Sequence, residues 1–260
     1  MGYLFEIQTV QSGAFKTLIE ALKDILADAN MEIDESGIKI MAVDNTSTVL
    51  AHMKLDATNF EKYSCTKRMV LGVSMGNLFK LIKTMVNSDI LTLYYEEENE
   101  NYLGLKIENC DKNSVTRYSL NLMDLNEENI RVPPTTFESV ITMPSNDFQK
   151  HIRDMSNLAE VLEITSVGQQ LTLKCDGEFA KQETVIGETS NGMSYIKNAS
   201  PEEIVQGLFS LKHLLLFTKC TNLSNNIEMF IKNDYPMIIR YGVANLGEIK
   251  LCLSPKLYND

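Results

Sequence analysis

Hydrophobic residues recur at three- and four-residue steps in three stretches of the chain, and a fourth stretch is apolar over most of the circumference of a helix, so the sequence predicts four helices. The stretches are SGAFKTLIEALKDILADAN from Ser12, SMGNLFKLIKTMV from Ser74, PSNDFQKHIRDMSNLA from Pro144 and SLKHLLLFTKCTN from Ser210. We expect Ser12 and Ser74 to cap the first two helices, because serine hydroxyls accept hydrogen bonds from the free N–H groups at helix starts. Ala29 and Met85 continue the apolar stripes of these two helices.

Apolar and polar residues alternate between the helical stretches, a pattern typical of strands that bury one face. The alternation is clearest at residues 38–40, 91–93, 103–107, 171–173 and 249–253. The sequence therefore predicts an α+β fold in which sheet dominates.

The second half of the chain repeats the first. The segment from Ser74 to Lys83 corresponds to that from Ser210 to Lys219, and Glu32-Ile33 corresponds to Glu163-Ile164. We predict two similar domains, residues 1–120 and 136–260, joined by a connector at residues 121–135. The connector ends on Pro133 and Pro134, which cannot donate to a sheet.

Composition excludes several classes of protein. With 44% hydrophobic residues among 260, the chain is expected to be globular, and no apolar run is long enough for a membrane span. The start lacks the pattern of a secretory signal, so we expect an intracellular protein. Five scattered cysteines form no C-x-x-C pair, and His52, His151 and His213 stand in unrelated contexts. We therefore expect no catalytic site, metal or cofactor.

The net charge of -11 by itself argues against nucleic acid as a partner, but the positions of the basic residues change this conclusion. Eight of the 24 basic residues lie in the four helical stretches, which leaves 16 against 35 acidic residues. They form four pairs: Lys16 and Lys23, Lys80 and Lys83, Lys150 and Arg153, Lys212 and Lys219. A single helical pair usually lines a solvated face, but four pairs in equivalent helices indicate a shared basic surface.

Six segments carry a resemblance to a known family. They are LIEALKDIL (18–26), LGVSMGNLFKLIK (71–83), LNLMDLN (120–126), MPSNDFQKHIRDMS (143–156), LFTKCTNLS (216–224) and LSPK (253–256). In this order and spacing, they make the chain resemble the proliferating cell nuclear antigen family of DNA sliding clamps over essentially its whole length.

The resemblance implies a DNA-clamp fold, in which helices line a ring and sheets form its outside. It implies a homotrimer that encircles double-stranded DNA without sequence preference, with the eight helical cations facing the DNA. The subunit edges would be residues 115–122 and 178–186. The interface residues implied are Val115, Tyr118, Leu120, Glu178, Thr184 and Ile186.

The resemblance also implies a pocket for short clamp-binding motifs of a DNA polymerase, a clamp loader and nucleases or ligases in replication and repair. The matching positions are Val43, Ser47, Leu50, Ile130, Val132, Pro236, Cys252, Ser254 and Pro255. From the residues alone, Ile130 and Val132 either pack on their own domain or offer a docking patch.

Two departures from the family pattern leave questions open. Cys252 stands where many relatives have tyrosine, which reduces the aromatic wall of the pocket, and Gly168 stands where eukaryotic relatives usually have a modified lysine. One subunit of a heterotrimeric clamp and a monomeric viral processivity factor remain alternatives. The resemblance implies the nucleus of a eukaryote, or of an infected host, as the location.

Overall fold

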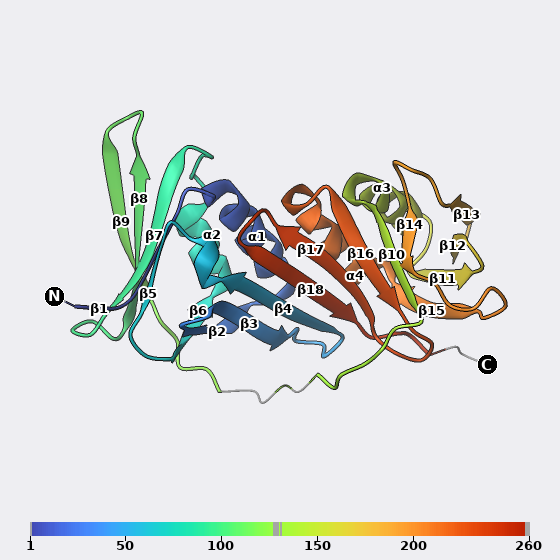
Figure 1. Cartoon of the computed structure of the whole chain (residues 1–260), viewed down its shortest axis with the longest axis horizontal. Coiled ribbons are helices and arrows are strands. Elements are labelled where there is room, and N and C mark those ends of the chain that lie inside the picture. Colours follow the sequence, from blue (N-terminus) through green and yellow to red (C-terminus); the bar gives the residue numbers. More distant parts are fainter. Residues whose placement is uncertain (1, 127–129, 131, 258–260) are drawn as a thin grey trace. The chain divides into compact units, whose positions relative to one another are not determined.

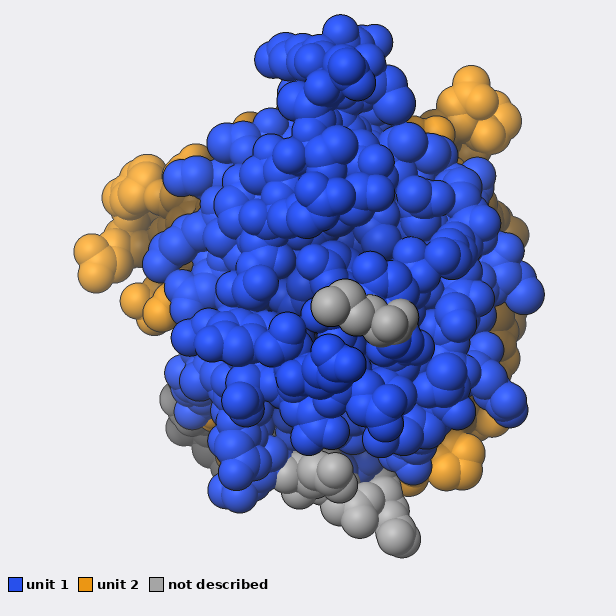
Figure 2. Space-filling model, turned by 90° about the vertical axis from the view of Figure 1, so that its left-hand side faces the viewer, with its two compact units in different colours: residues 1–45, 51–130, 242–249 blue, residues 46–50, 131–241, 250–260 orange. Residues whose placement is uncertain are grey.

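The structure of the chain is a computed structural model that describes residues 2–126, 130 and 132–257. Two compact units make up the molecule (Figures 1 and 2). Unit 1 comprises residues 1–45, 51–130 and 242–249, and unit 2 comprises residues 46–50, 131–241 and 250–260. Part of the predicted connector, residues 127–129 and 131, lies outside the described residues.

Unit 1 is built largely from the first half of the chain. Its elements are β1 (Tyr3–Thr9), α1 (Ser12–Ile25), β2 (Asp28–Asp34), β3 (Gly37–Val43), β4 (Val49–Asp56), η1 (Ala57–Asn59), β5 (Lys62–Cys65), β6 (Met69–Ser74), α2 (Met75–Ile82), β7 (Asp89–Glu96), β8 (Tyr102–Asn109) and β9 (Ser114–Asn121). They form one sheet of order β5-β1-β7-β8-β9 and a run of order β4-β3-β2-β6.

Unit 2 is built largely from the second half. Its elements are β10 (Ser139–Pro144), α3 (Ser145–Ser156), β11 (Val161–Val167), β12 (Gln170–Asp176), β13 (Lys181–Gly187), β14 (Ser194–Lys197), β15 (Val205–Ser210), α4 (Leu211–Phe217), η2 (Thr218–Leu223) and β16 (Asn226–Ile231). Strands β17 (Met237–Val243) and β18 (Gly247–Leu253), like β4, have residues in both units.

The two halves of the chain follow one plan. Each has a strand, a helix, five strands, a second helix and three strands, apart from short 3-10 turns. The order β14-β10-β16-β17 corresponds to β5-β1-β7-β8, and β13-β12-β11-β15 corresponds to β4-β3-β2-β6. The structure confirms both the α+β class and the internal duplication.

The helices pack in pairs, α1 with α2 and α3 with α4 (Figure 1). The apolar stripes of the helices are buried, with Phe15, Leu18 and Leu22 of α1 and Phe148 and Ile152 of α3 all inside the protein. The opposite helix faces remain available to solvent, because an amphipathic helix buries only one side.

Several helix boundaries differ from the sequence-based expectation. Ala29 lies in β2 and Met85 lies beyond the end of α2, so neither belongs to the predicted helix. Both residues are buried, and the apolar periodicity indicates burial without marking where a helix ends. Ser12 is the first residue of α1 rather than its cap, and its hydroxyl donates to the Val86 carbonyl at 3.0 Å. Ser74 occupies the N-cap position of α2, but its side chain makes no capping bond.

Candidate functional site

Each unit presents basic side chains on and beside its helix pair. Six of the eight predicted cations are exposed: Lys80, Lys83, Lys150, Arg153, Lys212 and Lys219. Neither α2 nor α4 carries an acidic residue, so their cations meet no opposing charge within the same helix. These surfaces suit an anionic polymer, because lysine and arginine contact phosphates without reading bases.

The remaining two cations, both on α1, are held against unit 1. The Lys16 ammonium donates to the Met85 carbonyl. The Lys23 ammonium lies 2.7 Å from Asp24 Oδ1 and 5.0 Å from the centre of the Phe79 ring. Their positive charge is therefore partly compensated, and they are weaker candidates for DNA contact than the exposed six.

Two of the predicted pairs extend past the ends of their helices. Lys83 is the C-cap residue that follows α2, and Lys219 lies in the 3-10 turn η2 rather than in α4. A nearby histidine adds little charge: burial lowers the pKa of His151 on α3, although Asp147 opposes the shift. At neutral pH this imidazole is mostly uncharged.

Two long sheet edges remain open. Six strands end a sheet in the described part of the chain: β5, β9, β14, β6, β13 and β15. Strands β5 and β14 have only four residues, and isolated bridges from Met123 to Gly72 and from Lys256 to Leu208 each pair one residue of β6 and of β15. Strands β9 and β13 are left with unpaired backbone groups, which invite a further strand.

The predicted interface residues map onto these two edges with two exceptions. Val115, Tyr118 and Leu120 lie in β9, and Thr184 and Ile186 lie in β13. Glu178 lies instead in the turn between β12 and β13, outside either strand. Leu120 is buried within unit 1, so its side chain is not available at the edge.

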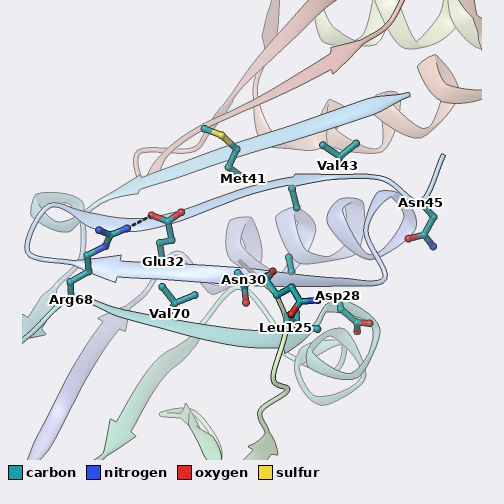
Figure 3. A pocket seen from close by; sticks show the side chains of 12 residues that line it. Asp28, Asn30, Glu32, Met41, Val43, Asn45, Arg68, Val70 and Leu125 are labelled. Carbon is teal, nitrogen blue, oxygen red and sulfur yellow. Dashed lines mark hydrogen bonds and ion pairs between the residues drawn. The ribbon is translucent and has the colours of Figure 1, made fainter. Parts of the chain in front are cut away.

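A cavity of about 490 Å³ lies in unit 1 beside the start of the connector (Figure 3). Its wall includes alternate residues of β2, namely Asp28, Asn30 and Glu32, and an ion pair of 3.3 Å joins Glu32 to Arg68. The full lining is Asp28, Ala29, Asn30, Glu32, Met41, Ala42, Val43, Asn45, Arg68, Val70, Leu125 and Asn126.

Of the residues that line this cavity, only Val43 belongs to the partner pocket predicted from the sequence. The missed signal is the strict alternation in DANMEID, where the buried Ala29, Met31 and Ile33 leave Asp28, Asn30 and Glu32 on the other face. The cavity mixes apolar side chains with more acidic than basic groups, so it can accept a chain segment that carries both apolar and basic side chains.

A glycine brings the start of the connector onto unit 1. The Met123 N–H donates to the Gly72 carbonyl at 2.9 Å, and a β-carbon at Gly72 would stand 2.1 Å from the Met123 carbonyl oxygen. The Asn30 amide also donates to the Asn126 carbonyl at 3.2 Å. Any larger residue at Gly72 would therefore push the connector away from the cavity.

In unit 2, several of the predicted pocket residues are tied together. The Ser254 N–H donates to the Thr48 carbonyl at 3.0 Å, which joins the loop of Ser47 and Leu50 to the segment of Ser254 and Pro255. Thr135 donates to the Tyr235 hydroxyl at 3.0 Å, which anchors the end of the connector next to Pro236. Val132 is exposed.

Four further pocket positions share the same degree of burial. Ile130, Leu50, Pro236 and Cys252 are half-buried. Burial raises the pKa of the Cys252 thiol to about 11, although Lys250 opposes the shift. Cys252 is therefore a neutral, apolar side chain at physiological pH rather than a nucleophile.

The described residues contain no group of three His, Cys, Asp or Glu side chains that could hold a metal ion. Within the same residues, no helix is both long and apolar enough to cross a membrane.

Comparisons with known proteins cover the chain almost completely. The N-terminal domain of proliferating cell nuclear antigen matches residues 4–129, and the C-terminal domain matches residues 131–256. A relative from Paramecium bursaria Chlorella virus 1, named "Probable DNA polymerase sliding clamp 1", is 34% identical over 98% of this chain and 97% of its own length. The proliferating cell nuclear antigen of Chaetomium thermophilum is 30% identical over 99% of this chain and 100% of its own length.

Proposed function

This chain belongs to the proliferating cell nuclear antigen family, and we propose that it forms a homotrimeric ring around duplex DNA and tethers replication and repair proteins to it. The family consists of DNA sliding clamps, which are processivity factors and not enzymes. The DNA-clamp fold follows from the two matching domains and the mixed sheets with four helices.

The observation that carries the proposal is the repeated helix pair with exposed cations in an otherwise acidic chain. Phosphate contacts hold a protein on DNA regardless of sequence, and flexible lysines exchange such contacts between neighbouring phosphates at low cost. An acidic exterior disfavours binding at other surfaces. Together these properties support sliding without release, with the protein retained by enclosure rather than by affinity.

Ring closure is supported by the two open edges. Strands β9 and β13 are different surfaces of one chain, so a contact between them is heterologous and must close into a ring or propagate as a filament. Three copies of a two-unit chain would give a ring of six units.

Partner capture is supported by two surfaces near the connector. The unit 2 group of Leu50, Val132, Pro236 and Cys252 offers apolar area, and the unit 1 cavity accepts basic side chains beside Asp28 and Glu32. A polymerase held there by a short motif would remain at high effective concentration near its template.

The mass in solution tests the proposal. Light scattering on the purified chain should give a mass near three times 29.4 kDa. A monomer at every concentration would favour a monomeric processivity factor, and a trimer formed only with other chains would favour a heterotrimeric clamp.

A further inference from the structure

In unit 1, the first helix is bonded to the segment that follows the second helix. Ser12 and Lys16 lie about one turn apart at the start of α1. The Ser12 hydroxyl donates to the Val86 carbonyl at 3.0 Å, and the Lys16 ammonium donates to the Met85 carbonyl. Both acceptors lie beyond the end of α2, so α1 fixes the course of the chain as it leaves α2.

Unit 2 has the same arrangement. Ser145 begins α3, and Gln149 follows about one turn later. The Ser145 hydroxyl donates to the Ser224 carbonyl at 2.6 Å, and Gln149 Nε2 donates to the Thr218 carbonyl at 3.2 Å. Both acceptors again follow the second helix of the unit, α4. Gln149 therefore occupies the position in unit 2 that Lys16 occupies in unit 1.

The two equivalent side chains share a hydrogen-bond donor and differ in charge. Lys16 and Gln149 are both half-buried, whereas Lys150, the neighbour of Gln149, is exposed. A backbone carbonyl accepts a hydrogen bond from the N–H of a neutral amide and from that of an ammonium alike. Because Gln149 makes its bond without a charge, the bond that Lys16 makes does not require the charge of Lys16.

In unit 2, this bond acts on the backbone of a cation. The Thr218 carbonyl lies in the same rigid peptide plane as the N–H of Lys219, which is exposed. Thr221 also donates to this carbonyl, at 2.6 Å, but from within η2, so it is Gln149 that supplies the link to α3. Holding the peptide plane sets the direction in which the Lys219 side chain leaves the backbone.

In unit 1, the equivalent bond holds the turn that contains a cation. The Met85 N–H donates to the Ile82 carbonyl at 3.0 Å, which closes a turn around the exposed Lys83. The Lys16 bond to the Met85 carbonyl joins this turn to α1. Each unit thus uses its first helix to fix a cation that follows its second helix.

We propose that Lys16 and Gln149 are positioning residues that do not contact DNA, and that they hold Lys83 and Lys219 in place to meet phosphates. This inference rests on the proposed function. It removes Lys16 from the DNA-contacting cations and assigns its N–H the role that the uncharged Gln149 has in unit 2. At this position a hydrogen-bond donor is required and a positive charge is dispensable.

A substitution without change of charge tests the role of Gln149. Methionine has about the length of glutamine but no donor. Gln149→Met should weaken binding to duplex DNA severalfold and lower the logarithmic salt slope, by up to about 0.9 for each phosphate that Lys219 no longer neutralises. Gln149→Lys supplies a donor again and should bind nearly as the native chain does.

Substitutions at Lys16 separate its charge from its donor. Lys16→Gln removes a charge but keeps a donor, and it should retain the native affinity and salt slope. Lys16→Met removes both, and it should weaken binding severalfold and lower the slope because Lys83 is displaced. Fluorescence anisotropy with a labelled duplex over a salt series compares all four variants with the native chain. Circular dichroism and light scattering verify folding and mass.

The outcomes separate this inference from the proposed function. A lower salt slope for Lys16→Gln than for the native chain would show that Lys16 itself neutralises a phosphate, and would overturn the inference. Native affinity and slope in both methionine variants would overturn it too, because the donor would then be dispensable. If a methionine variant does not fold, Lys16→Gln still decides, since a direct contact must lower its slope. A native chain that binds no duplex at any salt concentration would overturn the proposed function itself.

Discussion

Cys252 lies in the proposed partner surface, and the ionisation of its thiol can be measured. It is half-buried in β18. Because burial raises the pKa of its thiol to about 11, the side chain serves as apolar surface and not as a reactive group.

Alkylation should report this environment. At pH 8 only about a thousandth of a thiol with this raised pKa is ionised, and the thiolate is the reacting form. Iodoacetamide should therefore modify the exposed Cys110 well before Cys252, and the Cys252 rate should rise as the pH approaches 11. Peptide mass mapping over a pH series measures both rates.

A motif peptide with an aliphatic and an aromatic side chain should slow Cys252 alkylation further and leave Cys110 unaffected. Equal rates at the two thiols would contradict the buried environment. Absence of peptide protection at Cys252 would mean that partners dock elsewhere.

The limits of sequence reasoning are clearest at individual residues. Helical spacing placed Lys16 and Lys23 on one side of α1, but it could not show that Lys16 reaches the Met85 carbonyl, which is 69 residues away in the chain. The same limit applies to Ser12, whose hydroxyl bonds to Val86 instead of capping its helix. Tertiary contacts decide such partners, and periodicity does not encode them.

At the scale of elements, strand β9 combines eight residues with an uncovered backbone edge. The Ser119 N–H points to the open side, whereas the Leu120 N–H bonds to β8. Proline at Leu120 would thus damage unit 1 itself, and Ser119 is the better position at which to test the edge.

Ser119→Pro should weaken the trimer by removing one outward donor from each subunit contact while the chain stays folded, since proline is tolerated at strand edges. Ser119→Ala keeps the N–H and serves as the matched control. Light scattering compares the two variants. If Ser119→Pro dissociates no more readily than Ser119→Ala, the β9 backbone does not bond to a neighbouring subunit.

The helix α2 provides the second test at this scale. Lys80→Glu with Lys83→Glu should weaken DNA binding and reduce its salt dependence, by about 0.9 in the logarithmic slope for each phosphate that the variant no longer neutralises. Trimer mass should be unchanged. The control, Lys39→Glu with Lys54→Glu, makes the same change of charge on β3 and β4 and should bind DNA nearly as the native chain does.

Fluorescence anisotropy with labelled duplex, over a salt series, distinguishes these variants. An unchanged slope for the α2 variant, or an equal loss of affinity for the strand control, would mean that net charge and not the helix surface governs binding.

At the scale of the whole molecule, the duplication was predictable because burial imposes the same periodicity on both halves. The stretches from Ser74 to Lys83 and from Ser210 to Lys219 contain α2 and α4, which are equivalent helices in the two units. The unit 1 cavity was not predictable, because its wall combines β2, β6 and the connector, which are distant in sequence. The need for glycine at position 72 was not predictable either, because it arises from the close approach of the Met123 carbonyl.

The central claim, that the protein encloses DNA, is tested most directly by retention on a linear duplex. One end of the duplex is fixed to a bead, the protein is added at low salt, and the free end is then blocked with a bulky protein before a high-salt wash. A ring should remain on the blocked duplex through the wash and should slide off a duplex whose free end is open. A duplex that is blocked before the protein is added should retain no protein. Equal loss from the blocked and open duplexes would contradict enclosure and reduce the interaction to electrostatic attraction.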